Sequence, residues 1–122
     1  MIPTQYDDPI IACSTGRREN TAIGIIRLSG FPHITDLARF FSSGLEELKP
    51  RHVHHTRLIH PKKNSFIDEV LVTFFKGPHS YNGENILEIT CHGNQVNIDR
   101  IISLFIEEGE FRVAKNGEFT YR

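Results

Sequence analysis

The sequence predicts an α+β domain in which one mixed β-sheet packs against two or three helices. The 122 residues, 39% of them hydrophobic and 24% charged, suit a single compact core. Apolar runs rich in β-branched residues outnumber the stretches with helical spacing. The two kinds of segment do not alternate strictly along the chain, which disfavours a repeated βαβ order.

Two strands and a helix are expected in the first third of the chain. Residues 10–13 form a short apolar run, and residues 22–29 form a longer β-branched run that ends at a Gly and a nearby Pro. Apolar residues then recur at helical spacing over residues 34–41, with Thr35 as a cap and Gly44 as the stop.

Three further strands are expected in the middle of the chain. Residues 52–59 have apolar anchors near both ends, and residues 86–91 form a second apolar run. Residues 67–75 are almost continuously apolar, which is typical of a strand covered on both faces and central in its sheet. The loop over residues 78–84 contains an Asn-Gly pair that favours a tight turn.

The last quarter of the sequence is expected to form a helix and one short strand. Asn94 is a good N-cap, Gly109 ends the helical pattern, and residues 111–114 can add a strand before the turn at Asn116-Gly117. This helix is expected to cover the sheet. Its buried stripe is expected to consist of Val96, Ile98, Ile101, Ile102, Phe105 and Ile106.

Charge and cysteine content exclude several classes of protein. The formal charge of −1 leaves no global positive field for nucleic acid. No apolar run approaches the ~20 residues that span a bilayer. The segment Met1–Asp8 lacks the basic-then-apolar order of a signal peptide. Cys13 and Cys91 could pair in principle, but the composition favours reduced thiols and a cytoplasmic protein.

The sequence contains no phosphate-binding loop, dinucleotide-binding glycine motif or nucleophile elbow, so the chain alone is not expected to hydrolyse anything. The histidines between His52 and His60 raise the possibility of a metal site. On a strand, however, His54 and His55 point to opposite faces, so no metal ligand set is expected. Cys91 and His92 are adjacent, so on a strand their side chains also point to opposite faces, which argues against a Cys-His catalytic pair.

Arg27 and Glu88 are unusual because each interrupts an apolar strand. Alternation places Arg27 on the face of Ile25, and Glu88 on the face of Ile86. One interpretation is that both charges lie at a solvent-exposed face or pair with each other. The other is a cleft that presents a cation and a carboxylate to a polar ligand.

Several motifs occur in the order and spacing of a known family, the N-terminal domain of the tRNA modification GTPases called MnmE or TrmE, and the resemblance covers nearly the whole chain. The segments that carry it are Asp8-Pro9-Ile10-Ile11-Ala12, Gly24-Ile25-Ile26-Arg27-Leu28-Ser29-Gly30, Asp68-Glu69-Val70-Leu71-Val72, Ser80-Tyr81-Asn82-Gly83-Glu84-Asn85, Glu88-Ile89-Thr90-Cys91-His92-Gly93 and Gly117-Glu118-Phe119-Thr120-Tyr121-Arg122.

The resemblance implies that residues 1–122 form an excised N-terminal domain that binds a one-carbon tetrahydrofolate derivative, 5-formyl- or methylene-tetrahydrofolate, and builds a homodimer. It is related in fold to the folate domain of the glycine-cleavage T protein. The resemblance also implies a longer parent protein that hydrolyses GTP with Mg²⁺ and K⁺ in another domain. With a flavin-containing MnmG-type partner, that parent modifies the wobble uridine of tRNA.

Carried over residue by residue, the folate-contacting Arg and Glu of the family match Arg27 and Glu88. We expect Glu88 to accept hydrogen bonds from the pterin edge and Arg27 to orient the ligand. Tyr81 is a candidate stacking face. The sequence departs from the family at Asn116, where proline is usual, and in the loop Ser14–Asn20. The family also continues past Arg122 with a folate-contacting lysine.

Overall fold

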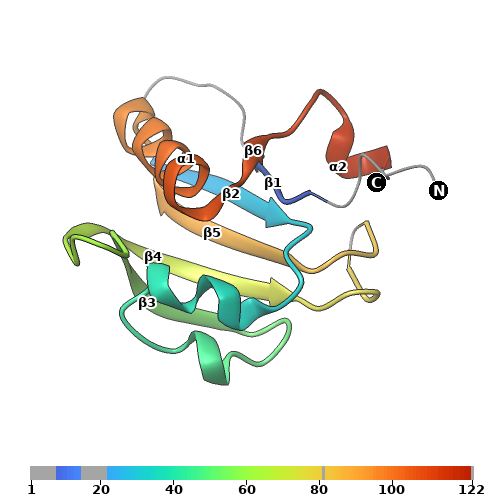
Figure 1. Ribbon diagram of the computed structural model, residues 1–122, viewed down its shortest axis with the longest axis horizontal. Coiled ribbons are helices and arrows are strands. Elements are labelled where there is room, and N and C mark those ends of the chain that lie inside the picture. The colour runs from blue at the N-terminus through green and yellow to red at the C-terminus, as the bar shows by residue number, and fades with distance from the viewer. Residues whose placement is uncertain (1–7, 15–21, 81, 122) are drawn as a thin grey trace.

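The computed structural model describes residues 8–14, 22–80 and 82–121, and these form an α+β domain, as predicted (Figure 1). Of the surface loop predicted over residues 14–20, residues 15–20 lie outside the described residues. The elements are β1 (Ile10–Cys13), β2 (Ile23–Ser29), the 3₁₀ helices η1 (Ile34–Phe40) and η2 (Leu45–Glu47), β3 (Val53–Ile59), β4 (Phe66–Phe75), β5 (Ile86–His92), α1 (Gln95–Gly109), β6 (Arg112–Val113) and α2 (Glu118–Tyr121).

Within the described residues, all the strands join one six-stranded sheet in the order β3-β4-β5-β2-β1-β6. Neighbouring strands are antiparallel except β1 and β6, which are parallel. The two strands at the centre, β5 and β2, are separated in the sequence by η1, η2, β3 and β4. The sheet therefore brings together residues that lie far apart in sequence.

Both α1 and η1 lie over the same face of the sheet (Figure 1). Their contact is aromatic: the ring centroids of Phe40 and Phe105 are 4.5 Å apart, and Phe111 meets Phe105 edge-on at 5.8 Å. Helix α1 approaches β2 closely at Gly24, where an added Cβ would lie 2.9 Å from the Cδ1 atom of Ile98. The opposite face of the sheet has no such helical layer among the described residues, and we call it the open face.

Strand β4 differs from the prediction because it is buried on one face only. Val70, Val72 and Phe74 are buried, whereas Leu71 between them is 41% exposed. The strand does pair with a neighbour on each side. The continuous apolar run reflects an open face that is itself partly apolar, not a second helical layer.

The predicted helix over residues 34–41 is a 3₁₀ helix, and its predicted caps are wrong. His33 is the N-cap, and Thr35 lies within the helix. The helix ends at Phe40 because Phe41 forms an antiparallel bridge with Leu58 of β3. Gly44, with a φ of 96°, begins η2 instead of ending η1.

The prediction for α1 is confirmed at its start, where the side chain of Asn94 accepts a hydrogen bond of 2.8 Å from the amide of Asn97. The predicted buried stripe is wrong at Val96 and Ile106, which are exposed, because both lie off the line of the buried side chains. The buried residues of this helix are Ile98, Ile101, Leu104 and Phe105.

The C-terminal turn is confirmed, with Gly117 in the left-handed region at a φ of 76°. Helix α2, which follows it, was not predicted. Its first residue, Glu118, is buried and accepts hydrogen bonds from the guanidinium of Arg112 and, at 2.9 Å, from the amide of Lys115. A helix of four residues has no apolar periodicity that a sequence could reveal.

Candidate functional site

Arg27 and Glu88 are directly opposite each other on the two central strands, β2 and β5. The Nε of Arg27 donates a hydrogen bond of 3.1 Å to the Oε2 of Glu88. The strand alternation predicted from the sequence is therefore confirmed for both residues. What the sequence did not establish is that their strands are neighbours in register.

The Arg27–Glu88 pair lies on the open face of the sheet. The side chain of Arg27 is 36% exposed and that of Glu88 is 23% exposed, whereas their neighbours Ile26, Leu28 and Ile89 are fully buried. Neither charge is inside the hydrophobic core. The pair is thus accessible to a ligand that approaches the sheet from outside.

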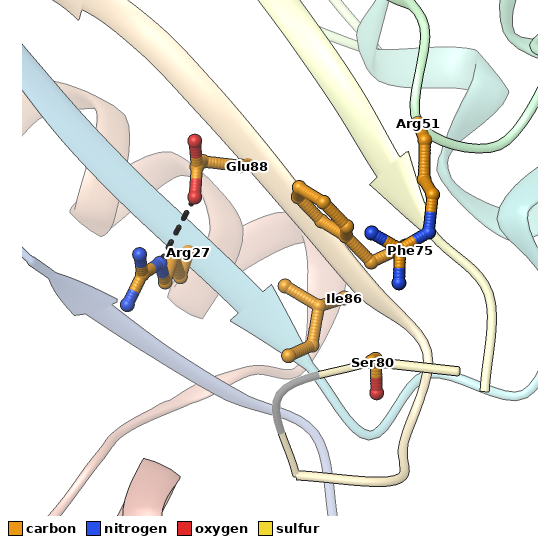
Figure 2. Close-up of a pocket in the computed structure, with 6 residues that line it drawn as sticks. All are labelled: Arg27, Arg51, Phe75, Ser80, Ile86 and Glu88. Atoms are coloured by element: carbon orange, nitrogen blue, oxygen red, sulfur yellow. Dashed lines mark hydrogen bonds and ion pairs between the residues drawn. The ribbon is translucent and has the colours of Figure 1, made fainter. Parts of the chain in front are cut away.

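A cavity of about 250 Å³ lies beside this pair (Figure 2). Its wall combines the ion pair with an aromatic ring, a hydroxyl, a branched aliphatic side chain and a second guanidinium. The lining residues are Arg27, Arg51, Phe75, Ser80, Ile86 and Glu88. This mixture of a flat apolar surface with a few convergent polar groups is typical of small-molecule sites.

Arg51, Phe75 and Ser80 were not recognised as site residues from the sequence. Arg51 lies in the turn before β3, and Ser80 lies in the loop between β4 and β5. Such positions carry no periodic pattern, and Phe75 looks like any apolar strand residue. The predicted stacking residue, Tyr81, lies outside the described residues.

The loop between β4 and β5 is fixed to the end of β2 by polar side chains. The Oγ of Ser29 donates a hydrogen bond of 2.7 Å to the Oε1 of Glu84, and the Nδ2 of Asn82 donates one of 3.1 Å to the Oγ of Ser29. The side chain of Asn85 accepts from the amide of Gly77 at 2.9 Å and donates to the main chain after β2. These contacts hold the Ser80 edge of the cavity in place.

A second cavity, of about 390 Å³, adjoins Arg27 on the side of β1, β6 and α2. Lys115, Asn116 and Thr120 contribute polar groups to it, and Phe119 contributes a ring. Arg27 lines both cavities. A ligand larger than the first cavity can therefore extend past Arg27 without leaving the surface.

Asp68 forms a separate polar cluster at the other end of β5. Its Oδ1 lies 2.7 Å from the Nδ1 of His92, and its Oδ2 accepts hydrogen bonds from the His92 amide at 3.0 Å and the Asn97 side chain at 2.9 Å. Burial raises the pKa of Asp68, but these hydrogen bonds outweigh burial and hold it below its ordinary value. The cluster joins β4, β5 and the start of α1.

The histidines in β3 and directly after it do not converge. The ring of His54 lies against Gly44, the Nε2 of His55 lies 3.7 Å from Glu69, and the Nδ1 of His60 accepts from the amide of Lys62 at 3.1 Å. Within residues 8–14, 22–80 and 82–121 no group of three His, Cys, Asp or Glu side chains is placed to hold a metal ion.

Cys91 is buried and His92 is exposed, as alternation along β5 predicts. Both cysteines are free thiols. Burial raises the pKa of the Cys91 thiol to about 12, which keeps it neutral at physiological pH.

The structure is thus a small α+β domain with a mixed-charge cavity on the open face of its sheet. Comparison with known families matches residues 9–122 to the family described as "GTP-binding protein TrmE N-terminus". The chain belongs to this family. No helix in the described part of the chain is long and apolar enough to cross a membrane.

Comparison with curated relatives supports the same family assignment. The chain is 39% identical over 120 residues to the tRNA modification GTPase MnmE of Alkaliphilus metalliredigens, covering 95% of this chain and 26% of the relative. The corresponding proteins of Aquifex aeolicus and Endomicrobium trichonymphae are 40% and 43% identical, with 94% and 95% of this chain covered and 25% and 24% of theirs. The chain spans about a quarter of the length of these relatives.

Proposed function

We propose that this chain is the N-terminal, one-carbon tetrahydrofolate-binding domain of a tRNA-modifying GTPase. The observation that carries this proposal is the cross-strand pair of Arg27 and Glu88, which lines a cavity on the open face of the sheet. The resemblance assigned folate contacts to these same two residues. Their convergence supports that assignment, because 61 positions of sequence separate them.

The chemistry of the cavity fits a reduced pterin. The ring of a pterin presents neighbouring N–H donors, and the Glu88 carboxylate can accept two of them in a charge-assisted manner. Arg27 can orient the ligand through a carbonyl or carboxylate. A cavity of about 250 Å³ accommodates a bicyclic ring that carries a 5-formyl or methylene group.

Calorimetric titration of the purified chain with 5-formyltetrahydrofolate tests this function. Saturable binding that is weakened by about 10- to 100-fold in Glu88→Gln and Arg27→Ala is the expected result. Absence of binding in the chain, repeated in a protein of the relatives' full length, would contradict the proposal. Binding that appears only in the longer protein would assign part of the site to residues beyond Arg122.

The open face supports a second part of the proposal, homodimerisation through this domain. It carries exposed apolar side chains at Ile23 and Val53, which are 54% and 67% exposed, as well as Leu71. Covering such a surface with a second copy removes apolar area from water. Sedimentation of the purified chain should show a dimer that Leu71→Glu weakens, and a strictly monomeric wild-type chain at high concentration would contradict this.

For the whole protein we propose the activity printed in the names of the relatives, that of a tRNA modification GTPase. We also propose that it acts in the cytoplasm. GTP, Mg²⁺ and K⁺ would bind outside this domain, and a flavin-containing MnmG-type partner would share the modification of the wobble uridine. Two experiments test the proposed activity of the whole protein. One is co-purification of the parent protein with its partner, and the other is nucleoside analysis of tRNA from a strain in which the gene is deleted. Unchanged wobble uridines in the deletion strain would contradict it.

A different function is favoured by one observation: Arg27 and Glu88 form an ion pair with each other across the sheet. In this alternative the domain is a structural or interaction module that does not bind folate, and the ion pair only stabilises the sheet. The partial exposure of both side chains argues against a large structural contribution, since exposed pairs contribute little to stability. The titration above separates the two functions.

A further inference from the structure

The cavity beside Glu88 has an excess of positive charge. Among the described residues that line it are two guanidinium groups, those of Arg27 and Arg51, and one carboxylate, that of Glu88. Glu88 is paired with Arg27, and among the described residues no carboxylate is paired with Arg51. The chain as a whole has a formal charge of −1, so this local excess is not a consequence of composition. It favours a ligand that carries an anionic group.

Arg51 is held in a backbone conformation that its residue type rarely adopts. The turn Lys49–His52 is closed by a hydrogen bond of 3.2 Å from the His52 amide to the Lys49 carbonyl, with Pro50 in its second position. Arg51 occupies the third position with a φ of 67°, where glycine is the usual residue of such a turn. Observed strain of this kind at the rim of a cavity points to a side chain with a function.

The side chain of Arg51 is also fixed in position. Its guanidinium lies 5.7 Å from the centroid of the Phe75 ring, and its Nη2 donates a hydrogen bond of 3.1 Å to the carbonyl of His79. In the view of Figure 2 the Phe75 side chain lies between Glu88 and Arg51. A guanidinium has five N–H donors, so this single hydrogen bond leaves it able to engage a carboxylate as well.

Glu88 and Arg51 act on different parts of the cavity. Phe75 is the cross-strand partner of Ile86, which precedes Glu88 by two residues on β5, or roughly 7 Å at the usual rise of a strand. A flat ring that meets the Glu88 carboxylate can therefore lie over Phe75, with its substituents directed toward Arg51.

We propose that Arg51 is a second anchoring residue of this cavity and binds a carboxylate of the ligand. The ligand class is then a flat, donor-bearing heteroaromatic ring joined to a carboxylate-bearing arm. This rests on the proposed folate site, for which the arm is the p-aminobenzoyl-glutamate group. Arg51 makes the site select folates over pterins that lack this arm.

The test compares two ligands across matched variants by calorimetry. The ligands are 5-formyltetrahydrofolate and tetrahydrobiopterin, a reduced pterin without the glutamate arm. Arg51→Gln should weaken the folate by about 10- to 100-fold, the usual effect of losing a charged hydrogen bond, and leave the pterin within about twofold. Arg51→Lys should restore part of the folate affinity. Arg57→Gln, which removes an exposed arginine of β3 away from the cavity, should change neither ligand.

A glycine fits the left-handed position, so Arg51→Gly is a second variant that keeps the turn and should show the same selective loss. Equal weakening of both ligands in the Arg51 variants, or no weakening of the folate, overturns the carboxylate role while leaving the folate site intact. Failure of both the wild-type chain and a protein of the relatives' full length to bind either ligand overturns the proposed function and the role of Arg51 with it.

Discussion

Replacing Glu88 by Gln should cost little stability, although it breaks an ion pair in the middle of the sheet. Gln keeps the size of Glu and can still accept one hydrogen bond from Arg27. The pair is formed by a single contact of 3.1 Å between side chains that are 36% and 23% exposed. Measured exposed pairs of this kind contribute about 0.2–1 kcal/mol, whereas breaking a buried pair costs about 3–5 kcal/mol. We therefore expect a loss of at most about 1 kcal/mol in the free energy of unfolding.

The assay is a double-mutant cycle with urea unfolding of the wild type, Glu88→Gln, Arg27→Gln and the double variant. The coupling energy of the pair should be about 0.5–1 kcal/mol. The matched control is the cross-strand pair of Arg57 and Glu69 on β3 and β4, whose Nε and Oε1 are 3.6 Å apart and whose side chains are more exposed. Its coupling should be smaller.

The same variants should behave differently toward ligand. Glu88→Gln should reduce folate affinity by about 10- to 100-fold through the loss of charged hydrogen bonds, whereas Glu69→Gln should not change it. A coupling energy of 3 kcal/mol or more for Arg27 and Glu88, with folate binding unaffected or absent, would refute the reasoning and identify the pair as a structural one.

Three further predictions concern stability and reactivity. Folding lowers the pKa of Asp68 from its ordinary value of 3.8, so the contribution of this carboxylate to stability is present above about pH 4 and is lost as the pH falls through the lower pKa of the folded state. Asp68→Asn should therefore make the melting temperature less dependent on pH in this acid range. The buried Cys91 thiol, with a pKa raised to about 12, should resist alkylation at pH 8 until the chain is unfolded, as peptide mass spectrometry can measure; rapid native labelling would contradict this. Gly44→Ala should destabilise by about 2 kcal/mol in urea unfolding, because a side chain is strained at its φ of 96° and the His54 ring, whose Nε2 would lie 1.9 Å from the added Cβ, must move aside. Gly117→Ala also has a positive φ but an open position, so it should cost only about 1 kcal/mol, and equal losses would disprove the steric contribution of His54.

The strands were predictable because β-branched runs and their turn residues are local signals. The runs over residues 10–13, 52–59 and 86–91 match β1, β3 and β5 within about one residue. Strand β4 was located correctly along the sequence, but its environment was not predicted correctly: it lies next to the edge strand β3 and is buried on one face only. Its apolar run has the sequence pattern of a strand that is buried on both faces, because a partly apolar open face gives the same pattern as a buried face.

The candidate site was predictable only in part. Alternation gave the faces of Arg27 and Glu88, but nothing local shows that β2 lies beside β5 with these residues opposed. Arg51 carries no signal of its own, because its position follows from the turn that precedes β3 and from the packing of that turn beside Phe75. A Lys-Pro-Arg turn without its usual glycine is the one feature that could have drawn attention to it.

The pairing of β1 with β6 has a consequence for the order in which the chain can fold during synthesis. Asp8 and Arg112 are joined side chain to side chain across 104 positions, and Glu118 completes the same cluster. The first strand to be synthesised, β1, can therefore pair along its outer edge only after β6, near the end of the domain, has been synthesised. Until then β1 exposes an unpaired edge. A ribosome stalled before residue 112 would therefore present a nascent sheet that is incomplete on the side of Arg27, where the second cavity forms.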